Sequence, residues 1–174
     1  MDREPVERAQ LGDESAFAAL AVRIGDRMYA AAHHILCDAG RAEDATQQAM
    51  IDIWRMLPQL KDPDRFQAWA YRILMRAAYA EARRRRSWGL REAAATGDYS
   101  FSPDHASRVA DRDQLERGFQ RLPVDHRAVV VLKHYAGLSN PEIAEALDIP
   151  EGTVRSRLHY SLKTLRAALE ADAR

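Results

Sequence analysis

Residues 138–169 constrain the fold of this chain more than any other stretch, and they read LSNPEIAEALDIPEGTVRSRLHYSLKTLRAAL. Ser139 is a favourable N-cap, Pro141 suits a first helical turn, and Glu142 adds the negative charge that a helix start prefers. The residue before Pro150 is disfavoured in the helical conformation, so a first helix should end just ahead of it. A second helix follows, opened by Gly152-Thr153, with apolar residues at helical spacing, namely Val154, Leu158, Leu162, Leu165 and Leu169.

The opposite face of this second helix is cationic and rich in hydrogen-bonding groups. It carries Arg155, Ser156, Arg157, His159, Tyr160 and Lys163. A short helix, a tight turn and a longer helix with such a face form the layout of a DNA-reading helix-turn-helix. A plain hairpin of two helices with a solvated basic face has the same spacing, so the pattern alone does not separate the two interpretations.

Composition favours an all-α fold. Only 8 Gly and 7 Pro occur in 174 residues, 47% of the residues are hydrophobic and 30% are charged. The charged N-terminus is not a signal peptide, and no run approaches the roughly 20 apolar residues of a membrane span. The single cysteine, Cys37, cannot form an internal disulfide, so the expected compartment is the cytoplasm.

The charge is unevenly distributed although the net charge is zero. Residues 61–91 hold nine basic and three acidic side chains, net +6, and this block contains the run Arg83 to Arg86. Residues 1–60 hold six basic and ten acidic side chains, net −4. A positive block between acidic or neutral segments indicates a surface that binds nucleic acid, next to surfaces that bind other partners.

Periodicity predicts two helical domains, residues 1–87 and 108–174, joined by a flexible linker over residues 88–107. In the first domain, helices are expected over 5–36, with a junction near Gly25, over 43–57 after a break at Ala39-Gly40, and from Phe66 to about Arg86. Met50, Ile53, Trp54 and Leu57 are expected to face its core. The linker holds Gly, Pro and small polar residues without a period, but also three aromatic residues. It is therefore either an inert tether or a segment that orders against a partner.

With these residues in place, the chain resembles the extracytoplasmic-function sigma factors, small bacterial transcription initiation factors of the sigma-70 family. AEDATQQAMIDIW (residues 42–54) is similar to their polymerase-binding helix, and FQAWAYRI (66–73) followed by RRRR is similar to their promoter-melting helix. Residues 122–158 are similar to their −35 reader. The resemblance implies a protein that directs core RNA polymerase to promoters, with promoter DNA and an anti-sigma factor as further partners and with no catalytic activity.

The resemblance also assigns roles to particular residues. Asp44, Gln47 and Gln48 would contact the polymerase. The −10 strand would be held by a cationic track with aromatic neighbours, namely Lys61, Arg65, Trp69, Arg72, Arg76, Arg83 and Arg84. The −35 element would be read by Thr153, Arg155, Ser156, Arg157, His159, Tyr160 and Lys163. For Asp44, Gln47 and Gln48 an ordinary solvated face is the alternative, and for Trp69 the alternative is core packing.

Two departures from the family pattern are visible. Arg76 and Ala80 stand where the family commonly has Asn and Asp, and Tyr160 stands where it commonly has Arg, followed by Ser161 and Leu162 in place of an Ala-Arg pair. Loss of cations there should weaken contacts to the DNA backbone or shift the preferred sequence.

The remaining chemistry of the sequence is sparse. His33 and Cys37 stand one helical turn apart, but zinc needs three or four ligands, so no metal site and no cofactor are expected, and Cys37 is expected to be a small buried hydrophobe. Two other functional classes stay open: a stand-alone helix-turn-helix regulator, and a sigma mimic that titrates an anti-sigma factor. The first leaves residues 42–54 without a purpose, and the retained arginines argue against the second.

Overall fold

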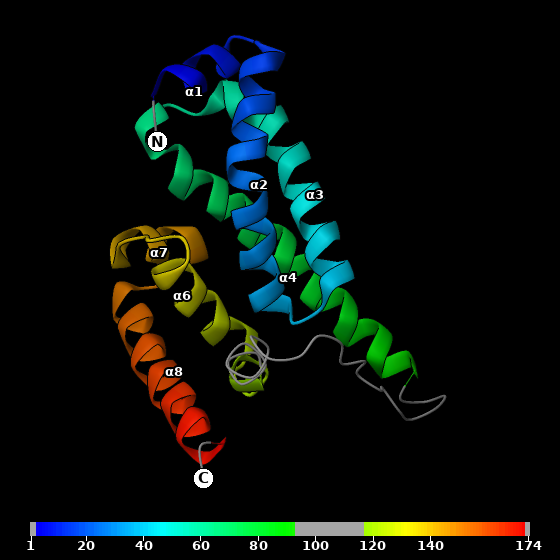
Figure 1. Cartoon of the computed structure of the whole chain (residues 1–174), viewed down its shortest axis with the longest axis vertical. Coiled ribbons are helices and arrows are strands. Elements are labelled where there is room, and N and C mark those ends of the chain that lie inside the picture. Colours follow the sequence, from blue (N-terminus) through cyan, green and yellow to red (C-terminus); the bar gives the residue numbers. More distant parts are fainter. Residues whose placement is uncertain (1–2, 93–116, 173–174) are drawn as a thin grey trace.

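The computed structural model describes residues 3–92 and 117–172, and within them every regular element is a helix, as the sequence predicts (Figure 1). The helices form two groups, one on each side of the undescribed segment. The first contains α1 (Arg3–Gln10), α2 (Glu14–Leu36), α3 (Ala39–Met56), the 3-10 turns η1 (Leu57–Gln59) and η2 (Pro63–Arg65), and α4 (Phe66–Glu92). The second contains a helical turn at 117–120, α6 (Val124–His134), α7 (Asn140–Leu147) and α8 (Glu151–Asp172).

The first helical junction lies at Gly12 and not at Gly25, where we expected it. Gly12 has φ +90°, a left-handed conformation that glycine adopts without strain, and it separates α1 from α2. Asp13 then caps α2 by accepting a hydrogen bond from the Ala16 amide at 3.0 Å. Gly25 lies inside α2, because a single glycine in a packed helix costs only about 1 kcal/mol.

The second junction falls two residues before the expected break at Ala39-Gly40. Cys37 is left-handed, with φ 52°, and closes α2. Asp38 is the N-cap of α3 and accepts a hydrogen bond from the Arg41 amide at 3.0 Å. The cap and not the glycine therefore sets the start of the helix, since an aspartate can satisfy an orphan amide and a glycine cannot.

The core of the first group is formed by apolar faces of α2, α3 and α4. Leu20, Ile53, Leu57, Phe66 and Leu74 are completely buried there. The prediction that Trp54 faces the core is wrong, because Trp54 is 37% exposed. Its ring contacts that of Phe17 in a tilted arrangement, with ring centroids 4.6 Å apart.

The fourth helix is longer than the sequence predicts. It continues past Arg86 to Glu92, so the first residues of the expected linker, from Trp88, are helical. Leu90, Arg91 and Glu92 are good helix formers and offset the cost of Gly89. The rest of the predicted linker lies outside the described residues.

The helix-turn-helix forms as expected from its local signals. Ser139 and Glu142 make a capping box at the start of α7, and Asp148 closes that helix in the left-handed conformation, with φ 54°. The inward register of α8 differs from the prediction at Leu162, which is 43% exposed, because fully buried Ser161 takes the core position; Leu165 is buried as predicted. The side chain of Leu169 lies outside the described part of the chain.

The two groups of helices pack against each other. α7 lies on α4, and α6 lies on α2, as Figure 1 shows. Two side chains of the first group donate hydrogen bonds to backbone oxygens of the second: Arg27 Nη2 to Tyr135 at 3.1 Å, and Gln67 Nε2 to Ala136 at 2.7 Å. None of the described helices is both long enough and apolar enough to cross a bilayer.

Candidate nucleic-acid interface

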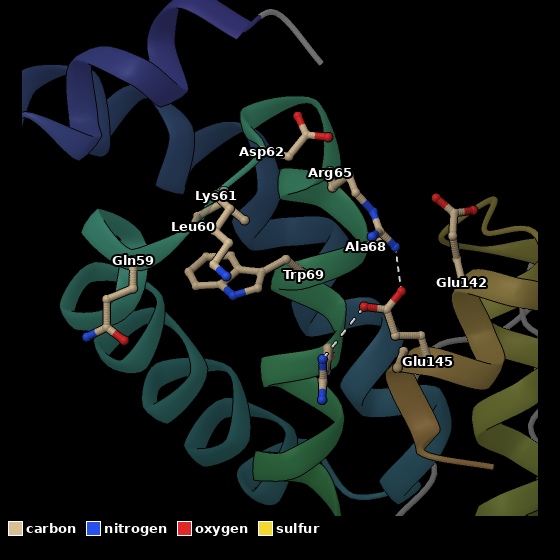
Figure 2. Close-up of a pocket in the computed structure, with 11 residues that line it drawn as sticks. Gln59, Leu60, Lys61, Asp62, Arg65, Ala68, Trp69, Glu142 and Glu145 are labelled. Carbon is tan, nitrogen blue, oxygen red and sulfur yellow. Dashed lines mark hydrogen bonds and ion pairs between the residues drawn. The ribbon is translucent and has the colours of Figure 1, made fainter.

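Four residues predicted to contact the −10 strand come together around one pocket. Lys61, from the loop between η1 and η2, and Arg65, from η2, line a cavity of about 290 Å³, and the first two turns of α4 add Trp69 and Arg72. Figure 2 shows Trp69 between Lys61 and Arg65 in this view. Lys61 and Arg65 are exposed, whereas Trp69 and Arg72 are half-buried. The pocket thus brings three cations and an aromatic face together, the groups that capture of an unstacked base and its phosphates requires, although Asp62, Glu142 and Glu145 also line it.

The other three members of the predicted −10 set do not join this pocket. Arg76 is exposed one turn further along α4. Arg84 lies about 18 Å beyond Arg72 along the helix axis and pairs with Glu81 at 2.7 Å. Arg83 is exposed beside it. These arginines extend the positive charge of the helix without contributing to the pocket.

The predicted −35 residues of α8 lie on an open face. Arg155, Ser156, His159, Tyr160 and Lys163 are exposed, and Thr153 is half-buried at the helix start. Within the helix, Arg155 pairs with Glu151 at 3.6 Å and Ser156 Oγ donates to the Thr153 carbonyl at 3.0 Å. These weak local contacts leave the side chains available to bases and phosphates.

Arg157 differs from the rest of the −35 set because it faces the protein. Its side chain is 23% exposed and its Nη2 lies 3.4 Å from Asp125 Oδ2 of α6. Asp125 lies in the first turn of α6 but does not cap it, since α6 has no side-chain cap. Asp125 instead lies between Arg157 and Tyr79 of α4. Burial raises the pKa of Tyr79, and the negative charge of Asp125 adds to that increase.

Next to this pair, His126 and Ser161 join α6 to α8. His126 Nδ1 lies 3.3 Å from Ser161 Oγ, which donates to the Arg157 carbonyl at 2.6 Å. Burial, assisted by the charge of Arg157, lowers the pKa of His126 and favours its neutral form. The exposed ring of Tyr160 contacts His126 edge-on, at 5.0 Å between centroids.

Asp44, Gln47 and Gln48 share one exposed face of α3. Together with Ile51, they line one wall of a shallow groove of about 380 Å³ whose other wall is formed by α4, including Arg84. Gln48 Nε2 donates to Asp52 at 3.0 Å. The three residues thus form a continuous polar patch beside an apolar strip, which is compatible with docking of a partner helix.

Cys37 is not the inert buried residue that we expected. It is half-buried, and the guanidinium of buried Arg127 on α6 donates to its sulfur, with Nη1 2.6 Å from Sγ. In residues 3–92 and 117–172, no three His, Cys, Asp or Glu side chains form a group that could hold a metal ion.

Sequence reasoning missed the acidic partners of the cationic residues. Glu145 of α7 makes an ion pair with Arg65 and lies 3.7 Å from Arg72, and Asp125 holds Arg157. These pairs join residues 80, 73 and 32 positions apart in the chain. No local spacing signals such contacts, and only the packing of the two helical groups produces them.

The fold defines an all-α protein whose second helical group contains a helix-turn-helix, α7 and α8. The Sigma-70 region 2 family model matches residues 20–88, and the Sigma-70 region 4 model matches residues 112–165. The RNA polymerase sigma-H factor of Pseudomonas aeruginosa is 32% identical, over 97% of this chain and 94% of that protein. The ECF RNA polymerase sigma factor SigL of Mycobacterium tuberculosis is 34% identical, over 76% and 77%.

Among solved structures, CnrH in complex with the cytosolic domain of CnrY superimposes with a TM-score of 0.70 at 30% identity, covering 98% of both chains. The chain belongs to the extracytoplasmic-function family of sigma-70 factors. It is a transcription initiation factor of the kind that directs core RNA polymerase to promoters.

Proposed function

We propose that this sigma factor docks on core RNA polymerase through the patch formed by Asp44, Gln47 and Gln48. All three side chains are exposed on α3, and the groove that they line offers both polar and apolar contacts. In this assignment, polymerase binding and −10 recognition belong to residues 1–87, and −35 recognition belongs to residues 108–174, with residues 88–107 between them.

The observation that carries the −10 assignment is the convergence of Lys61, Arg65, Trp69 and Arg72 on one pocket (Figure 2). A loop and a helix contribute these residues, and together they can bind phosphates and stack on a base that has left the duplex. Arg76, Arg83 and Arg84 would continue the track along α4.

For the −35 element, the exposed face of α8 would enter the major groove. Arg155 is the residue best placed for a bidentate contact with guanine, and Ser156, His159, Tyr160 and Lys163 surround it, with Thr153 at the phosphate near the helix start. Arg157 would reach DNA only after leaving Asp125, so we assign it a smaller share of the binding energy.

Regulation by an anti-sigma factor is the remaining part of the proposal. The solved structure of CnrH is a complex with the cytosolic domain of CnrY, and its similarity covers nearly the whole of this chain. We place the action of the protein in the cytoplasm with the polymerase, and we assign it no reaction of its own.

In vitro transcription tests the proposal. The purified chain is added to sigma-free core polymerase on fragmented genomic DNA, and transcript starts are mapped. Discrete new starts that share an upstream motif are expected. Polymerase binding without new starts would contradict the −10 assignment. Absence of polymerase binding would leave the chain as a DNA-binding regulator or as a mimic that titrates an anti-sigma factor.

A charge reversal tests the docking patch. Asp44→Arg should weaken binding to core polymerase by about tenfold, because it replaces a carboxylate in the proposed contact by a cation and so reverses the charge there. The matched control is Asp26→Arg, at an exposed aspartate of α2 away from the groove. Equal affinities of the two variants in a pull-down titration would remove Asp44 from the interface.

A further inference from the structure

The pocket that gathers the −10 residues has a second wall that does not come from the first helical group. Glu142, Glu145 and Ala146 of α7, the first helix of the helix-turn-helix, also line it. Figure 2 shows Glu145 and Arg65 pointing toward one another. Two acidic side chains therefore stand where a nucleic-acid strand would approach.

Glu145 contacts two of the cations directly. One of its carboxylate oxygens accepts a hydrogen bond from Arg65, and the other lies 3.7 Å from Arg72 Nη1. A carboxylate with two oxygens on two guanidinium groups imitates the way in which a DNA phosphate would bind them.

The same packing leaves the other faces open. The cationic face of α8 and the groove between α3 and α4 have no such cover from the described part of the chain. Contact between the two helical groups thus engages two members of the −10 set, Arg65 and Arg72, and none of the −35 face.

We propose that Glu145 competes intramolecularly with DNA phosphates for Arg65 and Arg72, so that the closed chain binds a single strand more weakly than an opened one does. This inference rests on the proposed function, since it takes Arg65 and Arg72 as DNA contacts. In the closed chain the −35 helix and the polymerase patch are available while Glu145 holds Arg65 and Arg72, and full engagement of these two arginines by the −10 strand requires their contacts with Glu145 to break.

The size of the effect follows from exposure. The side chains of Arg65 and Glu145 are 53% and 50% exposed, and ion pairs at such sites are weak. Removing the charge of Glu145 should therefore raise the affinity of the free chain for single-stranded DNA by about two- to fivefold at low salt.

The test measures anisotropy of a fluorescein-labelled single-stranded thymidine oligomer of about 12 nucleotides with the full-length chain. Glu145→Gln is compared with Glu14→Gln, which removes the same charge from an exposed position on α2. Both variants are repeated in a chain that carries Arg65→Ala and Arg72→Ala. Circular dichroism confirms that every variant is folded.

The expected result is tighter binding for Glu145→Gln than for Glu14→Gln, with no difference between them in the chain that lacks both arginines. Equal affinities of the two glutamate variants would overturn the competition, as would a gain that survives removal of the arginines. If the arginine substitutions alone leave DNA affinity unchanged, the −10 assignment itself fails, and this outcome is distinguishable from the first two.

Discussion

At the residue scale, Ser139 and Glu142 show how two side chains define where α7 begins. Ser139 donates from its amide and its hydroxyl to Glu142 Oε2, at 2.8 and 2.5 Å, and the Glu142 amide lies 3.5 Å from Ser139 Oγ. The orphan amides of the first turn are satisfied in this way. Because α7 contributes Glu145 to the pocket, this cap also fixes the position of that carboxylate.

A pH-dependent loss of stability should follow from this cap. Hydrogen bonds from the side chain and backbone of Ser139 lower the pKa of Glu142. A carboxyl with a lowered folded-state pKa stabilises the fold above its unfolded pKa, about 4.3, and this contribution is lost as the pH falls through the folded value. Glu142→Gln should therefore lower the free energy of unfolding by about 0.5 kcal/mol at neutral pH, and the difference should vanish in acid.

Urea unfolding followed by circular dichroism measures both free energies, at neutral pH and near pH 3. Glu43→Gln, at an exposed position of α3, is the control for loss of one carboxylate. A deficit of Glu142→Gln that stays constant from neutral to acid pH would show that the carboxylate plays no part in the cap.

Caps of this kind could be predicted because they depend on residues at most four positions apart. The sequence context alone predicts Ser139 as the cap of α7. Ser161 could not be found in this way, because a serine has no apolar signal and its core position depends on His126, 35 residues earlier. The pattern therefore assigned Leu162 to the core, where the structure places Ser161.

At the scale of the element, α8 shows what the departures from the family pattern do. Tyr160 and Leu162 are 54% and 43% exposed, while Ser161 is buried and fits where the family commonly has the small residue Ala. The two arginines that the family commonly has at positions 160 and 162 would therefore lie on the surface of α8, and their absence leaves the core unchanged. Restoring one of them should change DNA binding without disturbing packing.

Tyr160→Arg should strengthen binding of the free chain to duplex DNA several-fold at low salt. One new phosphate contact makes the dependence of the logarithm of affinity on the logarithm of salt concentration steeper by about 0.9. The variant loses only the edge-on contact of Tyr160 with His126. A salt titration of binding to mixed-sequence duplex DNA measures the slope.

Ala18→Arg, at an exposed position of α2, adds the same charge far along the chain from the helix-turn-helix. If it steepens the salt dependence as much as Tyr160→Arg does, the gain reflects net charge and residue 160 does not meet the DNA.

At this scale the sequence predicted the helices and their order, but not all of their lengths. Gly25 suggested a junction that is absent, and α4 continues through Gly89 to Glu92, because the cost of one glycine is small. The members of the −10 set were named from the resemblance, yet only the turns η1 and η2 explain why four of them meet and Arg84 does not.

At the scale of the whole molecule, the packing of the two helical groups decides which surfaces are available. Gln67 donates to the Ala136 carbonyl, Glu145 pairs with Arg65, and Arg127 donates to Cys37. These contacts lie on different helix pairs. If the two helical groups separate as rigid bodies, all three contacts must break together.

Cys37 can report this separation, because it is the only cysteine in the chain. Its sulfur is half-buried against Arg127, so alkylation by N-ethylmaleimide should be limited by opening. Gln67→Ala removes a hydrogen bond between α4 and the segment after α6, worth about 1 kcal/mol. The alkylation rate should then rise by about fivefold, as measured by mass spectrometry over time.

The matched control is Gln48→Ala, on the exposed face of α3, which removes a hydrogen bond within one helix and should leave the rate unchanged. Glu145→Gln should accelerate alkylation less than Gln67→Ala, since an exposed ion pair contributes less than a half-buried hydrogen bond. If neither variant changes the rate, a reagent reaches Cys37 through local motion at the end of α2. The two groups would then not open together, and release of the −10 pocket would have to occur by movement of α7 alone.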